Sequence, residues 1–195
     1  MAGRFTWLLI ALVAAAAAGC GTSAPTRFYT LASTAAADAA PPTRTGVMVG
    51  PVSVPASVDR PQFVVQVAPN RVEIDEFNRW AAPLGESIAR TVAGDLSALL
   101  GTPDVATAPF ANFDPDYRVT IDVQRFDSVQ GEAALVEAVW AVRKTAGGET
   151  RSGRTLAREA LQGEGFEALA AAHSRALAKL AADIAAAIRA AADAR

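Results

Sequence analysis

Few residues in this chain of 195 residues could perform chemistry, and two of them occur only once. Cys20 is the only cysteine and His173 is the only histidine. A lone cysteine excludes an intrachain disulfide. With this one histidine and one cysteine, neither a zinc site nor a Ser-His-Asp or Cys-His arrangement has convincing residues. His173 falls on the apolar stripe of a predicted helix, where a packed or boundary histidine is favoured over a catalytic one.

A cluster of acidic residues is the remaining candidate for acid and base chemistry. Glu73, Asp75 and Glu76 lie in one predicted strand, and the alternation puts Glu73 and Asp75 on its polar face. Carboxylates on such a face are more often solvated than catalytic. No glycine-rich phosphate loop opens a helix either. The sequence therefore predicts a protein that is not an enzyme and that needs no cofactor or metal.

Cys20 directly follows an apolar segment with the outline of a secretory signal peptide. Residues 1–19 contain Arg4, an apolar run and then a series of alanines. A transmembrane anchor is the alternative, but the apolar stretch from residue 5 to residue 19 is shorter than the roughly 20 residues that a spanning helix needs. A cysteine buried as a small apolar residue is also disfavoured, because its neighbours show no apolar periodicity. We predict that residues 1–19 are a signal peptide.

The four residues that end at Cys20 resemble the lipobox of bacterial lipoproteins. Ala17-Ala18-Gly19-Cys20 fits three of the four positions and departs at Ala17, where Leu is usual. The resemblance implies that the thiol of Cys20 carries fatty acyl chains, palmitate among them, and that a peptidase cuts before it. Gly21, in place of the Asp of inner-membrane lipoproteins, implies the outer membrane. Several acyl chains together would make the lipid anchor effectively permanent.

The rest of the chain divides into a tail and one domain. Residues 20–46 are predicted to be a lipidated N-terminus, with a short strand at 28–31 and then a flexible linker or long surface loop that has no large apolar residue. Residues 47–195 are predicted to be a single α+β periplasmic domain, long enough for a core of its own.

The periodicity of apolar residues predicts the elements of this domain. Alternation predicts a hairpin about Pro69-Asn70, a strand from Tyr117 with a bend at Arg125, and two following strands that complete an antiparallel meander. Helical spacing predicts one helix from Pro83 to Gly101 and another over residues 166–192. The predicted fold class is α+β, a largely antiparallel sheet with two main helices packed on one face.

Charge and aromatic residues bear on binding partners. The chain has 18 Lys+Arg against 20 Asp+Glu, so the basic footprint of a nucleic-acid-binding protein is absent. Trp80, just before the first helix, is compatible with a core or lid residue and also with an exposed partner surface. The sequence leaves these two alternatives for Trp80 open.

Several different short motifs follow one another in a definite order along the mature chain. In that order they are Phe28-Tyr29-Thr30-Leu31, Val49-Gly50-Pro51-Val52, Asp59-Arg60-Pro61-Gln62, Arg79-Trp80-Ala81-Ala82-Pro83-Leu84, Asp116-Tyr117-Arg118-Val119, Ala138-Val139-Trp140 and Ser174-Arg175-Ala176-Leu177. Their order and spacing resemble the ABC-type transport auxiliary lipoproteins of the PqiC type. Members of that family usually carry an acid at the position of Ala82, so a role of that acid does not transfer here.

The resemblance implies a function as well as a family. It implies an outer-membrane lipoprotein on the periplasmic face that works with an MCE-domain protein and an inner-membrane transporter component in lipid transport, and that assembles as a homo-oligomeric ring. A structural envelope lipoprotein that braces another export or secretion complex is the alternative. Besides Cys20, the candidate residues for partner binding or for structure are Phe28, Tyr29, Leu31, Arg60, Pro61, Arg79 and Trp80.

Overall fold

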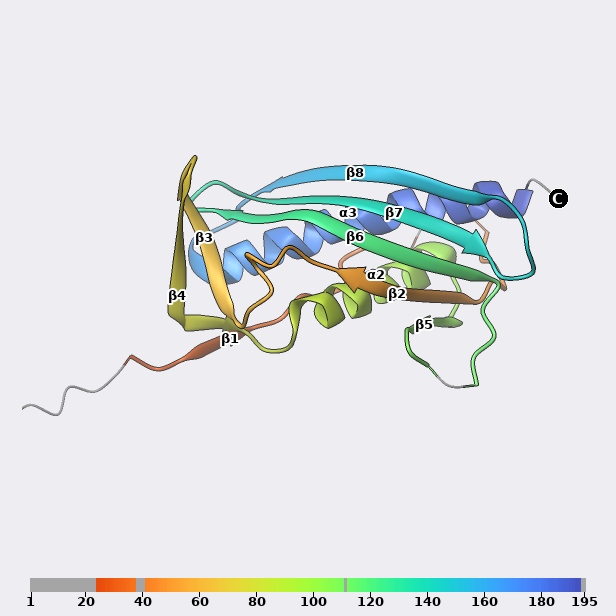
Figure 1. Cartoon of the computed structure of the whole chain (residues 1–195), viewed down its shortest axis with the longest axis horizontal. Helices are drawn as coiled ribbons and strands as arrows, with labels where there is room; N and C mark the ends of the chain where they lie inside the picture. Colours follow the sequence, from red (N-terminus) through yellow and green to blue (C-terminus); the bar gives the residue numbers. More distant parts are fainter. Residues whose placement is uncertain (1–23, 38–40, 111, 194–195) are drawn as a thin grey trace, which may run out of the picture.

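The computed structural model describes residues 24–37, 41–110 and 112–193 (Figure 1). Its elements are, in chain order, β1 (Arg27–Tyr29), β2 (Val47–Ser53), β3 (Gln62–Ala68), β4 (Arg71–Trp80), α2 (Leu84–Leu100), β5 (Val105–Thr107), β6 (Tyr117–Val129), β7 (Ala133–Lys144), β8 (Thr150–Ala160) and α3 (Gly165–Asp193). Cys20 and the predicted signal peptide lie outside the described residues.

The eight strands form one curled sheet of mixed direction. β6, β7 and β8 form the predicted antiparallel meander, and β3 and β4 form the predicted hairpin. The expectation of a largely antiparallel sheet is wrong in its detail, because β1 pairs with β4, β2 with β5 and β6, and β3 with β6 in parallel. The chain passes through α2 before it returns to the sheet, and such a crossover brings a later strand back in the same direction. The fold class α+β is confirmed.

Both helices cover the same face of the sheet, as predicted (Figure 1). Pro83 precedes the first turn of α2, and Gly101 ends it with φ of 64°, a left-handed conformation that glycine adopts without strain. α3 is rich in alanine, which favours helix formation, and many of its buried side chains are therefore small. The core lies between this helical layer and the sheet.

Burial follows the predicted alternation closely on β6. Tyr117, Val119, Ile121 and Val123 are buried, and the residues between them face outward. The register of β6 against β7 then shifts between Val123 and Arg125, which confirms the predicted bend.

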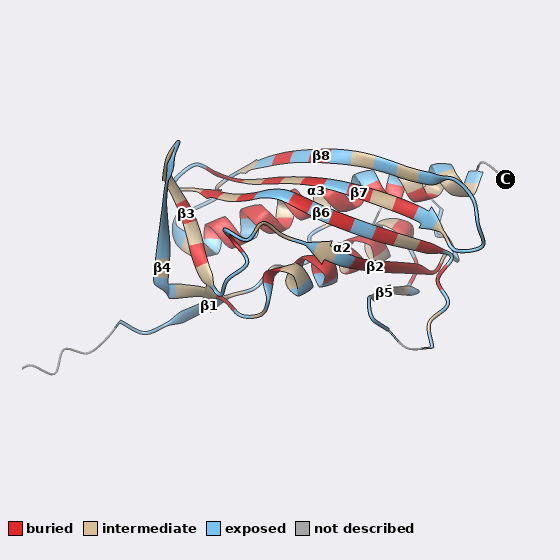
Figure 2. Cartoon of the chain, in the orientation of Figure 1, coloured by how far each residue is buried: buried red, intermediate tan, exposed pale blue. Residues whose placement is uncertain are grey.

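The β3–β4 hairpin stands at one end of the molecule, beside the point where β1 enters the fold. Figure 2 shows β4 mostly exposed in its first part, whereas its last three residues are intermediate or buried. The four residues from Arg71 to Ile74 are all exposed, so neither face of this part of the strand is covered by another layer. Alternation along β4 thus predicts the strand correctly but not its burial.

Residues 32–35, which we call the strap, cross the two helices. The amide of Ala32 donates to Ser174 Oγ of α3 (3.1 Å), and the hydroxyl of Ser33 donates to the carbonyl of Thr91 in α2 (3.0 Å). A Cβ on Gly94 would collide with the Ser33 side chain, so this glycine lets the strap lie close to α2. The sequence predicts a flexible linker or long surface loop here, and in the structure these four residues form hydrogen bonds with both helices.

Candidate functional site

Three segments that the sequence analysis singled out meet at one place in the fold. β1 runs parallel to the end of β4, with Phe28 opposite Arg79 and Tyr29 opposite Trp80. The amide of Ala81 donates to the carbonyl of Tyr29 (2.9 Å). The structure therefore brings the first motif into direct contact with the segment that leads into α2.

The loop before β3, at residues 59–61, reaches the same place. We call this meeting point of β1, the end of β4 and the segment that leads into α2 the junction. The amide of Trp80 donates to the carbonyl of Pro61 (2.6 Å), and the amide of Arg60 donates to the carbonyl of Val58 (2.8 Å). Arg60 and Pro61 are exposed, so their side chains stand on a loop whose backbone is held by hydrogen bonds. Hydrogen bonds within the fold therefore hold the backbone of this loop.

Trp80 belongs to the core, which decides between the two alternatives left by the sequence. Its side chain is 6 % exposed and stacks on Phe63 with ring centroids 4.1 Å apart. Tyr29 meets Phe63 edge to face at 5.4 Å, and Phe166 of α3 meets it at 5.2 Å. Such aromatic pairs add stability beyond the area that they bury. The cluster ties β1, β3, β4 and α3 together beneath the junction.

His173 lies in the same core and not at a reactive surface. Its ring is fully buried, stacks on Phe126 with centroids 3.8 Å apart, and shares a hydrogen bond between Nε2 and the hydroxyl of Ser128 (2.9 Å). Burial lowers the pKa of His173 to about 3, so the ring is neutral near pH 7. The expectation of a packed histidine is confirmed.

A cavity of about 370 Å³ opens beside Trp80. Its lining is mostly apolar, with one carboxylate and one guanidinium, and consists of Asp59, Arg60, Pro61, Trp80, Ala81, Ala82, Pro83 and Leu84. Ala82 adds a methyl group to this wall. A hollow of this kind can hold an apolar side chain of a partner and pair a charge beside it.

The other predicted residues lie around the cavity rather than in its lining. Arg79 turns back to Glu76, with an ion pair of 3.4 Å and a hydrogen bond from Nε to the Glu76 carbonyl. Leu31 packs against the core, and the hydroxyl of Tyr29 donates to Asn78 Oδ1 (2.8 Å). Phe28 is 64 % exposed and borders a different hollow, on the side of α3.

Asp95 is a residue that sequence analysis missed. It is buried on α2, and its Oδ1 accepts the amides of Thr34 (2.8 Å) and Ala35 (2.9 Å) of the strap. Burial raises the pKa of Asp95, although both amides favour the charged form. Within the described residues its Oδ2 has no hydrogen-bond partner. The sequence signal that could have revealed this role is the position of the acid, three residues after Val92 and within the apolar stripe of the helix.

The acidic cluster of β4 has a structural use. Burial raises the pKa of Asp75, but hydrogen bonds to its Oδ1 from the amides of Phe77 and Asn78 and from the Asn78 side chain outweigh this and leave the pKa below its usual value. Glu73 is exposed, as expected for a solvated face. Asp75 therefore fixes the backbone of β4 just before the junction.

Two further properties concern membranes and metals. In the described ranges, neither helix has an apolar stretch long enough to cross a bilayer. The same residues hold no group of three His, Cys, Asp or Glu side chains placed to bind a metal ion.

Comparison with known families identifies the chain. The model of the ABC-type transport auxiliary lipoprotein component family matches residues 29–185, which include the junction, the meander and most of α3. The chain belongs to this family. Its members are auxiliary transport components associated with a membrane as lipoproteins, and the family is not known as an enzyme family. The match confirms the resemblance that the ordered motifs indicated.

Solved structures show the same fold. An uncharacterised protein of known crystal structure matches with a TM-score of 0.69 and 20% identity, over 85% of this chain and 99% of that one. A Xanthomonas campestris protein matches with a TM-score of 0.66 and 20% identity, over 81% of this chain and 92% of that one. No curated protein sequence matches closely enough to count as a relative.

A dodecamer offers a more distant likeness. PelC from Paraburkholderia phytofirmans matches with a TM-score of 0.38 and 16% identity, over 76% of this chain and 88% of that one. This similarity is too low to indicate how the present chain assembles. The homo-oligomeric ring stays a prediction.

Proposed function

We propose that this family member is an outer-membrane lipoprotein that serves as the accessory subunit of an MCE-type intermembrane lipid transport system. In this role it docks the bridging MCE protein at the periplasmic face of the outer membrane, while the ABC-type component acts at the inner membrane. It works by positioning and not by catalysis.

The family match carries this proposal. An auxiliary component of an ABC-type transporter needs a surface for its partner and a fixed place in the envelope. Four of the motifs that support the family resemblance lie in the first half of the chain. Three of them, at residues 28–31, 59–62 and 79–84, meet at the junction of β1, β4 and α2, and the fourth lies in β2. The junction is therefore the surface that we assign to the partner.

Cys20 supplies the fixed place in this proposal. It precedes the first described residue, Ala24, by four positions. Acyl chains on its thiol contribute about 0.8 kcal/mol per buried methylene, so several chains hold the domain at the bilayer without a spanning helix. The junction then lies next to the membrane that the partner must reach.

The cavity supplies specificity for the partner. Its apolar wall can accept a projecting side chain, and Arg60 at its border can pair with an acid beside that side chain. Because the backbone around Pro61 is already held by hydrogen bonds, docking costs little ordering of the loop.

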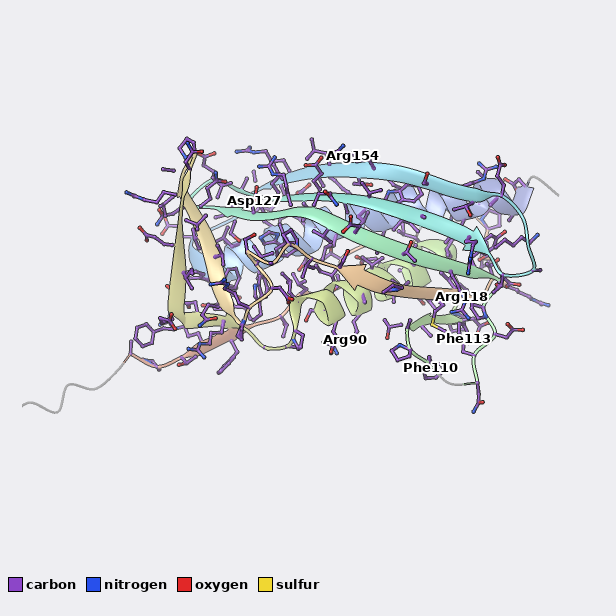
Figure 3. All side chains as sticks on the ribbon, in the orientation of Figure 1. Arg90, Phe110, Phe113, Arg118, Asp127 and Arg154 are labelled. Atoms are coloured by element: carbon purple, nitrogen blue, oxygen red, sulfur yellow. The ribbon has the colours of Figure 1, made fainter. Side chains whose placement is uncertain are left out.

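Purification after cross-linking in living cells tests the proposal. We expect an MCE-domain protein among the captured partners of the wild type and its loss with Arg60→Glu. Arg90→Glu is the matched control, because Arg90 is also exposed, lies on α2 (Figure 3) and is not among the residues that line the cavity. Capture of a different export or secretion complex, with no MCE protein, would contradict the proposal and favour the bracing role.

A further inference from the structure

Exposed apolar side chains gather on β1 and β4. In the described part of the chain, seven large apolar side chains are exposed, and four of these lie on the two strands: Phe28, Val72, Ile74 and Phe77. The other three are scattered over β7, β8 and a loop. Single exposed apolar residues are ordinary, but a group on two paired strands marks an interaction surface.

The fold itself presents Phe77 outward. Against β3, the register of β4 is irregular between Asp75 and Arg79, since Phe63 pairs with Asp75 whereas Gln62 pairs with Arg79. Within this irregularity the Phe77 amide donates to Asp75 Oδ1 (2.9 Å). The turn is thus stabilised by a side chain, and Phe77 is 44 % exposed as a consequence of it.

Phe28 and Phe77 are the exposed phenylalanines of the β1–β4 strand pair. In the parallel ladder Phe28 is opposite Arg79, and residues in register point to the same side. Asn78 and Trp80 of β4 face Tyr29 and the core, and Phe77 is the exposed residue that directly precedes Asn78. Both phenyl rings are exposed at this end of the fold, and we call them together the phenylalanine face.

The length of the preceding chain decides what this face meets. From Cys20 to Phe28 the chain has eight steps, and at 3.3–3.6 Å per residue these span about 29 Å at most. As a random coil, eight residues extend over only about 16 Å on average, from 5–6 Å × √n. A bilayer that holds an acylated Cys20 is thus within reach of this strand pair, and Figure 1 shows that β1 and β4 lie at the end of the fold where the chain enters.

We propose that the phenylalanine face is a lipid-contacting surface, on which Phe28 and Phe77 enter the interfacial region of the bilayer that holds Cys20. This inference rests on the proposed function only for the lipid anchor. With the membrane already tethered, two aromatic side chains suffice to orient the domain, because the anchor has removed most of the entropic cost of association.

Charge around the face shows which kind of lipid contact to expect. Arg27, Arg71 and Arg79 are balanced on the two strands by Glu73, Asp75 and Glu76. Attraction to anionic headgroups is therefore weak, and burial of the phenyl rings supplies the contact. We expect little dependence on salt or on the fraction of anionic lipid.

Quenching by brominated lipid tests the inference directly. The acylated protein is purified from its host and reconstituted in vesicles of phosphatidylethanolamine and phosphatidylglycerol with brominated acyl chains. Phe28→Trp and Phe77→Trp report on the face, and Phe110→Trp is the control, because Phe110 is 59 % exposed but lies beside Phe113 near β5 at a distance from β1 (Figure 3). The native Trp80 and Trp140 are buried and provide a constant background.

We expect blue-shifted emission and strong quenching at positions 28 and 77, and neither at position 110. Quenching at positions 28 and 77 no greater than at position 110 would overturn the inference, provided that the thermal midpoints of all variants match the wild type. Failure to capture an MCE protein leaves this result intact, so the two proposals fail separately. If Phe28→Ser and Phe77→Ser abolish partner capture while the Trp variants show no quenching, the face belongs to a protein partner and the lipid assignment is wrong.

Discussion

The meander β6–β7–β8 and the β3–β4 hairpin are both antiparallel and both alternate apolar with polar residues, yet they bury their strands differently. On β6, Val119 and Ile121 are at most 2 % exposed, because α3 and α2 close over that face of the sheet. On β4, Val72 is 56 % and Ile74 43 % exposed, because no layer covers them. Alternation thus predicts a strand, whereas burial depends on what the rest of the fold places against it.

A matched pair of isoleucines gives the largest expected effect. Ile121→Ala removes buried methylene groups and leaves a cavity, so we expect a loss of about 2–5 kcal/mol in the free energy of unfolding. Ile74→Ala, with the same change of side chain on β4, should alter it by less than about 0.5 kcal/mol. Urea denaturation measures both. Equal losses would mean that β4 is covered in solution and would contradict the difference in burial between β4 and β6.

The buried histidine predicts a dependence of stability on pH. The unfolded chain binds a proton near pH 6.5, whereas folded His173 binds one only near pH 3, so stability is complete above pH 6.5 and falls as the pH drops toward 3. The loss from this one group is about 1.4 kcal/mol per pH unit within that window. In the difference between wild type and His173→Gln, measured by denaturation from pH 7 to pH 5, this slope should appear. Identical slopes would contradict the burial of a neutral ring.

The hydrogen bond between Tyr29 of β1 and Asn78 of β4 allows the stability of the exposed end to be tested separately. Tyr29→Phe removes the donor to Asn78 Oδ1 and keeps the ring, so we expect a loss of about 0.5–1.5 kcal/mol. Thr30→Ala, an exposed neighbour, is the control and should be nearly neutral. Thermal unfolding of the two variants provides the test, and a neutral Tyr29→Phe would show that the ring packing alone holds β1.

The smallest expected effect is local to the strap. Asp95→Ala removes the acceptor of the Thr34 and Ala35 amides, and loss of about 1 kcal/mol corresponds to roughly fivefold faster hydrogen exchange at these two amides. Asp95→Asn retains an acceptor oxygen. We therefore expect the Thr34 and Ala35 amides of this variant to exchange much more slowly than those of the alanine variant. If both variants exchange as the wild type does, Asp95 does not hold the strap.

Sequence patterns predicted much of the fold because its strongest elements are periodic and sharply bounded. Pro83 and Gly101 mark the ends of α2, and the shift of phase at Arg125 marks the bend in β6. The direction of strand pairing could not be predicted in this way, since it depends on contacts between residues far apart in sequence. The parallel pairing of β1 with β4, for example, joins residues about 50 positions apart.

The candidate site was predictable in its residues but not in their roles. The motifs around Tyr29, Pro61 and Trp80 do meet, yet the sequence could not assign Trp80 to the core or Arg79 to a partner on its own strand. Asp95 was missed because an isolated acid in an apolar stripe acquires its partners only when the strap folds over it. Exposure on both faces of β4 is likewise a property of the assembled layers.

We propose that a lipid on Cys20 holds one end of this domain against a bilayer. Mass spectrometry of the N-terminal peptide, taken from protein extracted from the membranes of its own host, tests this claim most directly. We expect a chain that starts at Cys20 and carries the added mass of a diacylglyceryl group on sulfur and of a further fatty acyl chain on the amine. A peptide that retains residues 1–19, with a free thiol at Cys20, would contradict it.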